Sequence, residues 1–422
     1  MNIRVKVENP NAGHSRFTAI ASKSMAHRFL LADALTRLCK NEGAELLIST
    51  TSKDIEATRD CVSALLAPEV EGRRARFLCQ ESGSTFRFLL PIVGALGRKG
   101  CFVLEGRLKD RPLSPLYEEM TAHGCILSEQ GTPLFLIDGK LSGGVYTIAG
   151  NVSSQYITGL LFALPLVEGD SEIHITGKLE SADYVEMTLK VLETAGIKIR
   201  RTDYGFAVPG SQKYALSGQV VVEGDWSNAA VYLAMGALTE GGVTCTNLSL
   251  DSAQGDKRIL DVLRSFGATV AVDAQAQSVT VRQDEKLHGI DLDVSDIPDL
   301  VPVMAVVAAG AHGVTHFTNA SRLKLKESDR LASVTDAIRA LGGQASQDGE
   351  TLTVIGSGQL SGGTVRSEND HRIVMLGALA AFISSGEVCI EDAGAIAKSF
   401  PSFFDELKEG GACYGIDIRK QD

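Results

Sequence analysis

A sixfold repeat is the feature that most constrains the fold of this 422-residue chain. In six segments, a short run of small and polar residues leads into an apolar stretch rich in Ala, Leu and Gly. These segments begin at Ser22, Ser82, Ser153, Asp225, Ile297 and Glu368, so that successive starts lie 60, 71, 72, 72 and 71 residues apart. Self-similarity at a fixed period indicates that one structural unit recurs along the chain.

A second, amphipathic series lies between these segments. Acidic or Ser residues stand early in its members and Gly usually follows their ends, which are start and stop signals of helices. The six members span residues 54–66, 114–124, 182–195, 255–267, 328–342 and 401–410. Short β-branched runs, such as Glu172–Thr176 and Val279–Val281, predict strands between the helices. Each repeat should therefore hold two helices and about four strands, with the first, apolar helix buried and the second at the surface.

The totals of the chain limit its class of function. Its length favours two domains. A net charge of −11 argues against general binding to nucleic acid or acidic membranes, which needs a basic surface. No signal peptide opens the chain, no apolar run approaches the roughly 18 residues of a membrane span, and the eight Cys show no zinc-site spacing. We therefore expect a cytoplasmic protein with reduced thiols.

Polar and basic residues at the starts of the buried helices are the candidate ligand-binding groups. Lys23 stands at a helix N-terminus, where the dipole disfavours a cation, and an anionic ligand would resolve that conflict. Ser24 and Arg28 lie four residues apart on the same helix face. Ser and Asp at such positions are also ordinary helix caps. Ser153-Ser154-Gln155, however, has more polar residues than one cap requires.

Further basic residues recur near the same points of the repeat. Lys326 and Arg330 are spaced i, i+4 with Glu327 beside them, and Arg372 opens the last buried helix. Arg107, Arg111 and Lys398 occupy extended or loop segments. A single charge of this kind usually lies on a solvated surface. Their recurrence against apolar helices indicates instead a set of ligands for phosphate and carboxylate.

Eight motifs in order resemble one family. They are SKSMAHR at residues 22–28, Gly83-Ser84-x-x-Arg87, RPLSP at 111–115, NVSSQ at 151–155, Ile-Pro-Asp at 297–299, KESDR at 326–330, NDHR at 369–372 and AKSFP at 397–401. Together they are similar to the 5-enolpyruvylshikimate-3-phosphate synthases (EPSP synthases, 3-phosphoshikimate 1-carboxyvinyltransferases), and the resemblance covers essentially the whole chain.

The resemblance implies an α/β fold of the enolpyruvyl transferase, inside-out barrel type. Two similar domains would each contain three βαβαββ repeats with buried helices, and the chain would cross between the domains twice. Residues 1–21 and 223–422 would form one domain and residues 22–222 the other, with the active site in the cleft between them.

The resemblance also implies the reaction: the enolpyruvyl group of phosphoenolpyruvate passes to the 5-hydroxyl of shikimate 3-phosphate and phosphate is released. This step belongs to the shikimate pathway to chorismate and the aromatic amino acids. The implied chemistry needs acid/base groups and a cationic clamp of Arg and Lys, and no metal or cofactor. We expect a monomer whose partners are these two substrates.

By motif position, Asp299 resembles the base near the attacking hydroxyl, and Glu327 and Lys23 resemble its proton-handling partners. The residues matched to shikimate 3-phosphate binding are Lys23, Ser24, Arg28, Ser153, Ser154, Gln155, Ser181, Tyr184, Asp299 and Lys326. Those matched to phosphoenolpyruvate binding are Lys23, Gly83, Arg111, Gln155, Arg330, Arg372 and Lys398. Gly83 suits this role because a residue without Cβ lets a ligand approach the backbone.

The chain departs from the family pattern at two places. Glu81-Ser82-Gly83-Ser84 stands where many members have Asn-Ala-Gly-Thr, which puts a carboxylate near the phosphoenolpyruvate pocket. Arg322 stands where many have Asn, so that substrate contact is not carried over. Glyphosate sensitivity and the division of acid and base roles stay open.

Two alternatives stay open as well. A UDP-N-acetylglucosamine enolpyruvyl transferase generally carries a Cys in a Gly-rich loop, which the stretch 107–115 lacks. A non-catalytic repeat scaffold would release no phosphate from the two substrates.

Overall fold

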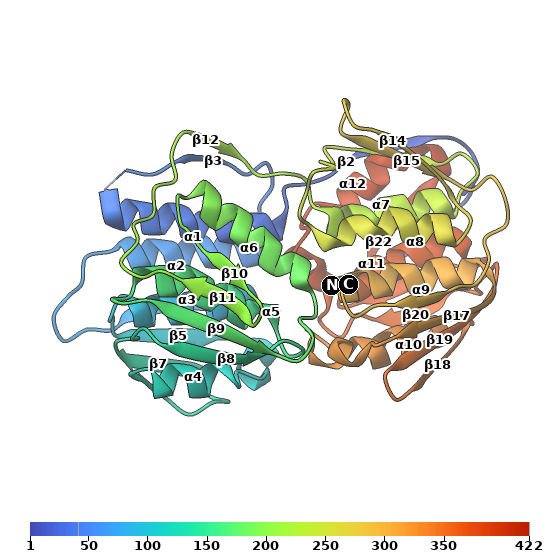
Figure 1. Cartoon of the computed structure of the whole chain (residues 1–422). Helices are drawn as coiled ribbons and strands as arrows, with labels where there is room; N and C mark the ends of the chain where they lie inside the picture. Colours follow the sequence, from blue (N-terminus) through green and yellow to red (C-terminus); the bar gives the residue numbers. More distant parts are fainter. Residues whose placement is uncertain (41, 422) are drawn as a thin grey trace. The chain divides into compact units, whose positions relative to one another are not determined.

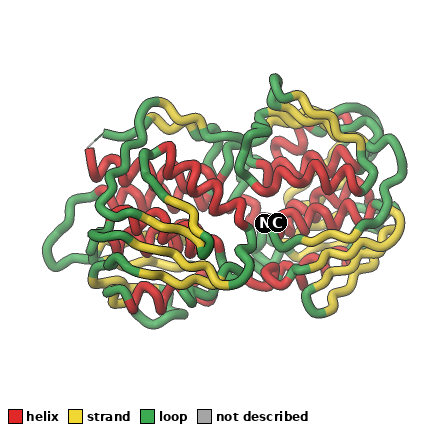
Figure 2. The backbone as a smooth tube through the Cα atoms, viewed as in Figure 1, coloured by secondary structure: helices red, strands yellow, loops and turns green. Residues whose placement is uncertain are grey.

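The computed structural model describes residues 1–40 and 42–421, which form two compact units. Unit 1 consists of residues 1–22 and 223–422, and unit 2 of residues 23–222. In each unit the helices pack against one another and the strands form sheets around them (Figures 1 and 2). None of the helices in the described part of the chain is long and apolar enough to cross a bilayer.

Unit 2 contains six helices and three sheets in its described residues. The helices are α1 (Lys23–Lys40), α2 (Lys53–Leu66), α3 (Gly83–Ala95), α4 (Leu116–Ala122), α5 (Ser154–Ala163) and α6 (Ala182–Thr194). One sheet has the order β4 (Ala75–Gln80), β5 (Gly100–Leu104), β7 (Leu134–Gly139) and β6 (Cys125–Leu127). The next has the order β8 (Val145–Ala149), β9 (Ser171–Thr176), β11 (Gly205–Val208) and β10 (Arg200–Thr202). The third pairs β3 (Glu45–Leu47) with β12 (Gln219–Val221).

Unit 1 repeats this plan across its described residues. Its helices are α7 (Trp226–Ala237), α8 (Ile259–Ser265), α9 (Val301–Gly310), α10 (Arg330–Ala340), α11 (His371–Ala380) and α12 (Phe403–Gly410). One sheet has the order β2 (Ser15–Thr18), β13 (Val243–Thr246), β15 (Ser278–Arg282) and β14 (Thr269–Asp273). The second has the order β16 (Asp291–Asp293), β17 (His312–Thr318), β19 (Thr351–Ser357) and β18 (Gln344–Asp348). The third has the order β20 (Gly363–Arg366), β21 (Val388–Glu391), β1 (Asn2–Val7) and β22 (Ile416–Gln421).

The same strand pairing recurs in each four-stranded sheet. Two strands are parallel and an antiparallel pair completes the sheet, as in β8, β9, β11 and β10. A buried helix joins the parallel strands directly except for β2 and β13, between which the chain also runs through unit 2. In the last sheet the N-terminal strand β1 occupies the position that β11 has in the sheet of β8, because this repeat supplies only the three strands β20, β21 and β22. The predicted α/β repeat is therefore confirmed in five copies.

The first copy differs, because it forms only the parallel pair β3 and β12. From α2 the chain runs to β4, which belongs to the next sheet, without an intervening hairpin. The missing hairpin explains why the first interval of the repeat is 60 residues and the others 71 or 72.

The predicted division of burial is confirmed. In α9 every residue from Val301 to Ala309 is buried, and α11 is buried from end to end. The helices α7, α9 and α11 contact one another within unit 1, as α3 and α5 do within unit 2. The second-series helices, such as α2 and α6, bury one face only, because polar residues alternate with apolar ones at helical spacing.

Candidate functional site

In unit 2, Lys23 is the first residue of α1 and its ammonium pairs with the Asp54 carboxylate of α2 over 2.9 Å. Both side chains are largely shielded, with exposed fractions of 16% and 14%. The carboxylate offsets the unfavourable placement of a cation at a helix N-terminus. Asp54 is a partner that the sequence alone did not single out.

Arg28 is buried one turn further along α1. Its guanidinium donates to the Ser24 carbonyl over 2.7 Å, to the Tyr184 carbonyl over 2.8 Å and to the Thr188 hydroxyl over 2.9 Å. It also lies 5.2 Å from the centre of the Phe88 ring. Burial lowers the pKa of Arg28 to about 10, so the group stays cationic at neutral pH. The backbone carbonyls of Ser24 and Tyr184 therefore contact the same cation.

The N-termini of α3 and α5 meet around the Gln155 side chain. Its amide donates to the Ser84 hydroxyl over 3.1 Å, and its carbonyl accepts from Arg87 over 2.7 Å. A Cβ built on Gly83 would lie 2.8 Å from a terminal nitrogen of Arg111 and 3.5 Å from the Gln155 carbonyl oxygen. Gly83, Arg111 and Gln155 therefore surround one small volume. The sequence motif contained Arg87, but no role was assigned to it.

Ser153 and Ser181 precede helices in different ways. The Ser153 hydroxyl caps α5 by accepting a hydrogen bond from the backbone N–H of Gln155 over 3.3 Å, and Ser154 is buried in the first turn. Ser181 is buried in a left-handed conformation before α6 and forms no side-chain cap. The capping interpretation thus holds for Ser153, whereas a cap does not explain Ser181.

A buried chain of polar groups links the first helices of unit 2. His27 contacts the Thr58 hydroxyl over 2.6 Å, Thr58 contacts Thr85 over 2.6 Å, and Thr85 donates to Ser82 over 2.7 Å. Burial, with the nearby charges of Lys23 and Arg28, lowers the pKa of His27 well below its usual value. His27 is therefore neutral at physiological pH and adds no cation to the cluster.

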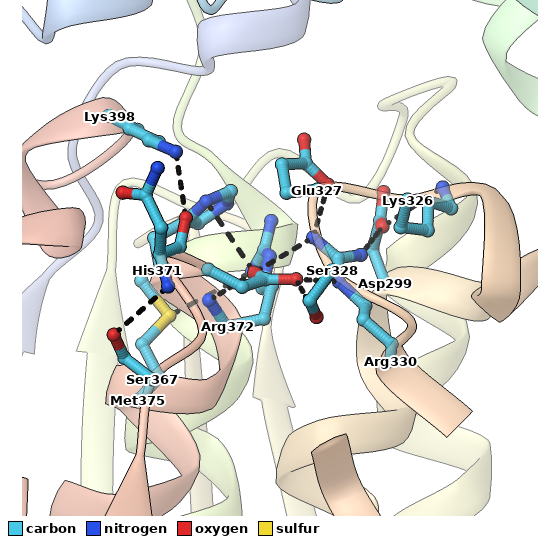
Figure 3. A network of polar contacts seen from close by, with 12 residues as sticks. Asp299, Lys326, Glu327, Ser328, Arg330, Ser367, His371, Arg372, Met375 and Lys398 are labelled. Carbon is cyan, nitrogen blue, oxygen red and sulfur yellow. Dashed lines mark hydrogen bonds and ion pairs between the residues drawn. The ribbon is translucent and has the colours of Figure 1, made fainter. Parts of the chain in front are cut away.

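In unit 1, the side chain of Arg330 is the centre of an ion cluster (Figure 3). It is 1% exposed and donates to three carboxylates, those of Asp370 over 2.7 Å, Glu327 over 2.8 Å and Asp299. Burial alone would lower the pKa of Arg330, but the three carboxylates outweigh it and raise that pKa. One cation thus fixes the two carboxylates, Asp299 and Glu327, that the motifs single out.

Lys326 joins this cluster by donating to the Asp299 carboxylate over 3.1 Å. Burial lowers the pKa of Lys326, and Asp299 opposes that effect. Lys326 and Arg330 are four positions apart in the sequence, but only Arg330 lies in α10, and Lys326 lies in the preceding loop. The two cations meet through Asp299 instead.

The N-terminus of α11 supplies the remaining groups. Asp370 caps this helix, accepting from the Arg372 amide over 2.9 Å and from the Ser328 hydroxyl over 3.1 Å. Lys398 is buried and donates to the Asn369 carbonyl over 2.7 Å. Arg372 is buried nearby, and its guanidinium donates to the Ser227 carbonyl over 2.7 Å and to the Ser227 hydroxyl.

Two of the sequence-level observations need adjustment. Arg322 is nearly buried in the short helix η5 (Ser321–Leu325) and lies close enough to lower the pKa of Lys326, so it belongs to this cluster. Asp370 stands out in the sequence only as part of the NDHR motif. Its buried contacts with Arg330 depend on a residue 40 positions away, which no local pattern signals.

Each unit therefore presents a compact set of polar groups at buried helix ends. The described contacts of unit 2 gather Lys23, Arg28, Arg87 and Arg111 near hydroxyls and helix amides, a chemistry suited to anions. The set in unit 1 joins cations to carboxylates that can take up or release protons.

Comparison with known proteins gives a consistent result. Residues 7–407 match the family model described as EPSP synthase (3-phosphoshikimate 1-carboxyvinyltransferase). A protein of that name from Clostridium kluyveri is 36% identical over 419 residues, covering 96% of each chain. Another from Clostridium acetobutylicum is 38% identical over 410 residues, covering 92% of this chain and 93% of the relative.

Solved structures share the fold. An EPSP synthase from Acinetobacter baumannii superposes with a TM-score of 0.79 at 22% identity, covering 99% of this chain and 100% of that one. The enolpyruvyl transferase NikO from Streptomyces tendae superposes with a TM-score of 0.75 at 17% identity, covering 99% and 98%. The predicted two-domain α/β architecture is confirmed by these neighbours.

Proposed function

The chain belongs to the EPSP synthase (3-phosphoshikimate 1-carboxyvinyltransferase) family, and on that premise we propose that its two clusters together transfer the enolpyruvyl group of phosphoenolpyruvate to the 5-hydroxyl of shikimate 3-phosphate. The family match favours shikimate 3-phosphate over UDP-N-acetylglucosamine as the acceptor. It also favours an enzyme over a repeat scaffold.

The proposed chemistry conserves protons at each step. The 5-hydroxyl attacks C2 of phosphoenolpyruvate and loses its proton to Asp299, while C3 gains a proton from Glu327 or Lys23. The resulting tetrahedral adduct then returns one C3 proton to the group that supplied it and expels phosphate, which takes up the proton held by Asp299, and the C2–C3 double bond of the enol ether product is formed. The reaction requires the acids of unit 1 and Lys23 of unit 2 to act on the same pair of substrates.

The observation that carries the proposal is the buried guanidinium of Arg330, which holds both acid/base candidates. Carboxylates that exchange protons must be placed within hydrogen-bond reach of the reacting atoms. Arg330 fixes Asp299 and Glu327 from one rigid, buried group, while Lys326 adds a second cation to Asp299. These contacts support a site that is preorganised for proton transfer.

Within this proposal, the anionic groups of the substrates have separate partners. The hydroxyls and helix amides around Ser24, Ser153 and Ser154 suit the phosphate of shikimate 3-phosphate. Arg111, Gly83 and Gln155, together with Arg372 and Lys398, suit phosphoenolpyruvate. Arg330 is already engaged by three carboxylates, so we assign it chiefly to holding the acids.

The test is release of phosphate by the purified chain. Both substrates together should give steady release, whereas either substrate alone should give none. Glu327→Gln should lower kcat by about a hundredfold or more, the usual contribution of a general acid or base. Glu350→Gln, at an exposed turn of the same unit, is the matched control and should leave kcat unchanged.

Two outcomes would contradict the proposal. Release that does not require shikimate 3-phosphate, or that proceeds equally well with UDP-N-acetylglucosamine, would exclude the assigned acceptor. Wild-type kcat in Glu327→Gln would remove that carboxylate from the chemistry.

A further inference from the structure

Arg87 lies where helices α3 and α5 pack together in unit 2. It is the fifth residue of α3, and its side chain is buried. Gly159 of α5 permits the close approach of the two helices, because a Cβ at that position would lie only 2.3 Å from the Arg87 carbonyl oxygen. The backbone of Arg87 is therefore fixed against α5, and its guanidinium reaches the first turn of that helix.

The two terminal nitrogens of Arg87 bind two different carbonyl groups. One donates to the side-chain oxygen of Gln155 over 2.7 Å, and the other donates to the backbone carbonyl of Pro112 over 2.8 Å. The Pro112 carbonyl also accepts from the Tyr156 hydroxyl, and the Cζ of Arg87 lies 5.4 Å from the centre of the Tyr156 ring. Pro112 directly follows Arg111 in the chain. Arg87 thus connects two residues that suit phosphoenolpyruvate, Gln155 and Arg111.

The contact with Arg87 determines which way the Gln155 amide faces. A guanidinium only donates hydrogen bonds, so the atom that it meets must be the amide oxygen. The Ser84 hydroxyl accepts from the amide nitrogen over 3.1 Å, but a hydroxyl could equally donate to an oxygen at that place. Ser84 therefore does not select an orientation of the amide, whereas Arg87 does.

This orientation leaves an amide donor for a ligand. The nitrogen of a Gln side chain carries two N–H groups, and within residues 1–40 and 42–421 only one of them has a partner, the Ser84 hydroxyl. An anion beside Gly83 and Arg111 could accept from the second. In the reversed orientation both N–H groups would face the guanidinium of Arg87, and the oxygen in their place would repel the anion.

We propose that Arg87 is a positioning residue for the binding of phosphoenolpyruvate, because it fixes the orientation of the Gln155 amide and holds the Pro112 carbonyl beside Arg111. The inference rests on the proposed function, which assigns Gln155 and Arg111 to that substrate. Both terminal nitrogens of Arg87 already donate to carbonyl groups of the protein. We therefore assign it no contact with the substrate, and its effect passes through its two partners.

The two partners depend on Arg87 to different degrees. The Pro112 carbonyl keeps the Tyr156 hydroxyl as a donor when Arg87 is removed. The Gln155 oxygen loses the only donor that it has among the described residues, so its amide can turn or bond elsewhere. The loss of Arg87 should therefore act mainly through Gln155.

The first experiment is a double-mutant cycle of Arg87 with Gln155. Arg87→Ala should raise the KM for phosphoenolpyruvate by about tenfold, the lower end of the loss expected for a hydrogen bond to a charged group, and should raise the KM for shikimate 3-phosphate by less. In a Gln155→Ala background no amide is left to orient, so Arg87→Ala should add a factor of about two or less. Arg76→Ala, at an exposed position of β4 in the same unit, is the matched control and should leave both constants unchanged.

The second experiment separates positioning from structural support. Arg87→Lys keeps the charge and a buried aliphatic stem, but an ammonium lacks the planar fork that binds two carbonyls at once. This variant should unfold at nearly the wild-type temperature and still have a KM for phosphoenolpyruvate raised by about threefold or more, an effect that should again shrink in the Gln155→Ala background. If Arg87→Ala fails to fold, the cycle with Arg87→Lys decides the matter.

Full additivity in the cycle, or an equal rise in both Michaelis constants, would overturn the inference, since a merely structural role produces both. A wild-type protein that releases no phosphate from the two substrates would overturn the proposed function and this inference with it. An active wild type whose Arg87 variants keep the wild-type KM for phosphoenolpyruvate would overturn this inference alone.

Discussion

Replacing Gly83 by Ala should weaken phosphoenolpyruvate binding selectively. The new Cβ would lie 2.8 Å from a terminal nitrogen of Arg111 and 3.4 Å from its Cζ. Ordinary van der Waals contacts of a Cβ begin at about 3.4 Å, so the distance to the nitrogen is too short. The Arg111 guanidinium must therefore move by about half an ångström. Displacements of that order at a binding group cost up to a hundredfold. We expect the KM for phosphoenolpyruvate to rise by about tenfold to a hundredfold, equivalent to about 1.4–2.8 kcal/mol.

The stability of the fold should not fall with that affinity. The close contact is the far end of a side chain, and Ala favours helices over Gly by up to about 1 kcal/mol, so Gly83→Ala should unfold at or above the wild-type temperature. Steady-state kinetics with each substrate varied in turn is the assay. Gly394→Ala, where a Cβ meets open space, is the control.

A cycle with Arg111 tests the cause of this effect. In an Arg111→Ala background the guanidinium that the new methyl group would displace is absent. Gly83→Ala should then raise the KM for phosphoenolpyruvate only a little further. An undiminished effect in that background, or an equal rise in the Michaelis constants of both substrates, would refute the placement of Gly83 beside phosphoenolpyruvate.

Three further predictions concern charged groups. Lys23→Met should lower kcat by at least about a hundredfold, because it removes a proton-handling cation, while calorimetry shows a nearly unchanged melting temperature; near-normal turnover would exclude Lys23 from the site. Arg330→Lys should lower the free energy of unfolding, measured in urea, by about 3–5 kcal/mol, because an ammonium cannot reproduce the planar guanidinium that binds three carboxylates. A loss below about 1 kcal/mol would contradict this. Burial raises the pKa of Asp256 from 3.8 to about 7, so folding takes up a proton between these two pH values. The free energy of unfolding of the wild type should therefore fall by up to about 4 kcal/mol as the pH rises through that window. Asp256→Asn should remove that loss, and parallel stability profiles for the two proteins would count against a buried, titrating Asp256.

Much of the fold could be predicted because its signals are local and repeated. The second-series helices were placed at 54–66 and 182–195 and occur at Lys53–Leu66 and Ala182–Thr194. The run Glu172–Thr176 lies within strand β9. Gly after an amphipathic run, and β-branched residues in short runs, determine such boundaries without help from distant residues.

The candidate site was predictable only as a set of residues. The motifs identified Asp299, Glu327 and Arg330, but the sequence does not show that one buried guanidinium binds both acids. That contact also needs Asp370, which lies 40 positions from Arg330 along the chain.

The caps of the buried helices show how one repeat supports two different sites. In unit 2 the N-termini of α3 and α5 are capped by the neutral hydroxyls of Ser82 and Ser153, which leave the positive end of the helix dipole unopposed. In unit 1 the N-termini of α7 and α11 are capped by the carboxylates of Asp225 and Asp370. A carboxylate cap neutralises the dipole locally and can hold a cation, as Asp370 holds Arg330. The same fold thus has hydroxyl-capped, positive helix ends in one unit, which we propose for phosphate binding, and carboxylate-capped helix ends in the other, which we propose as part of the proton-transfer machinery.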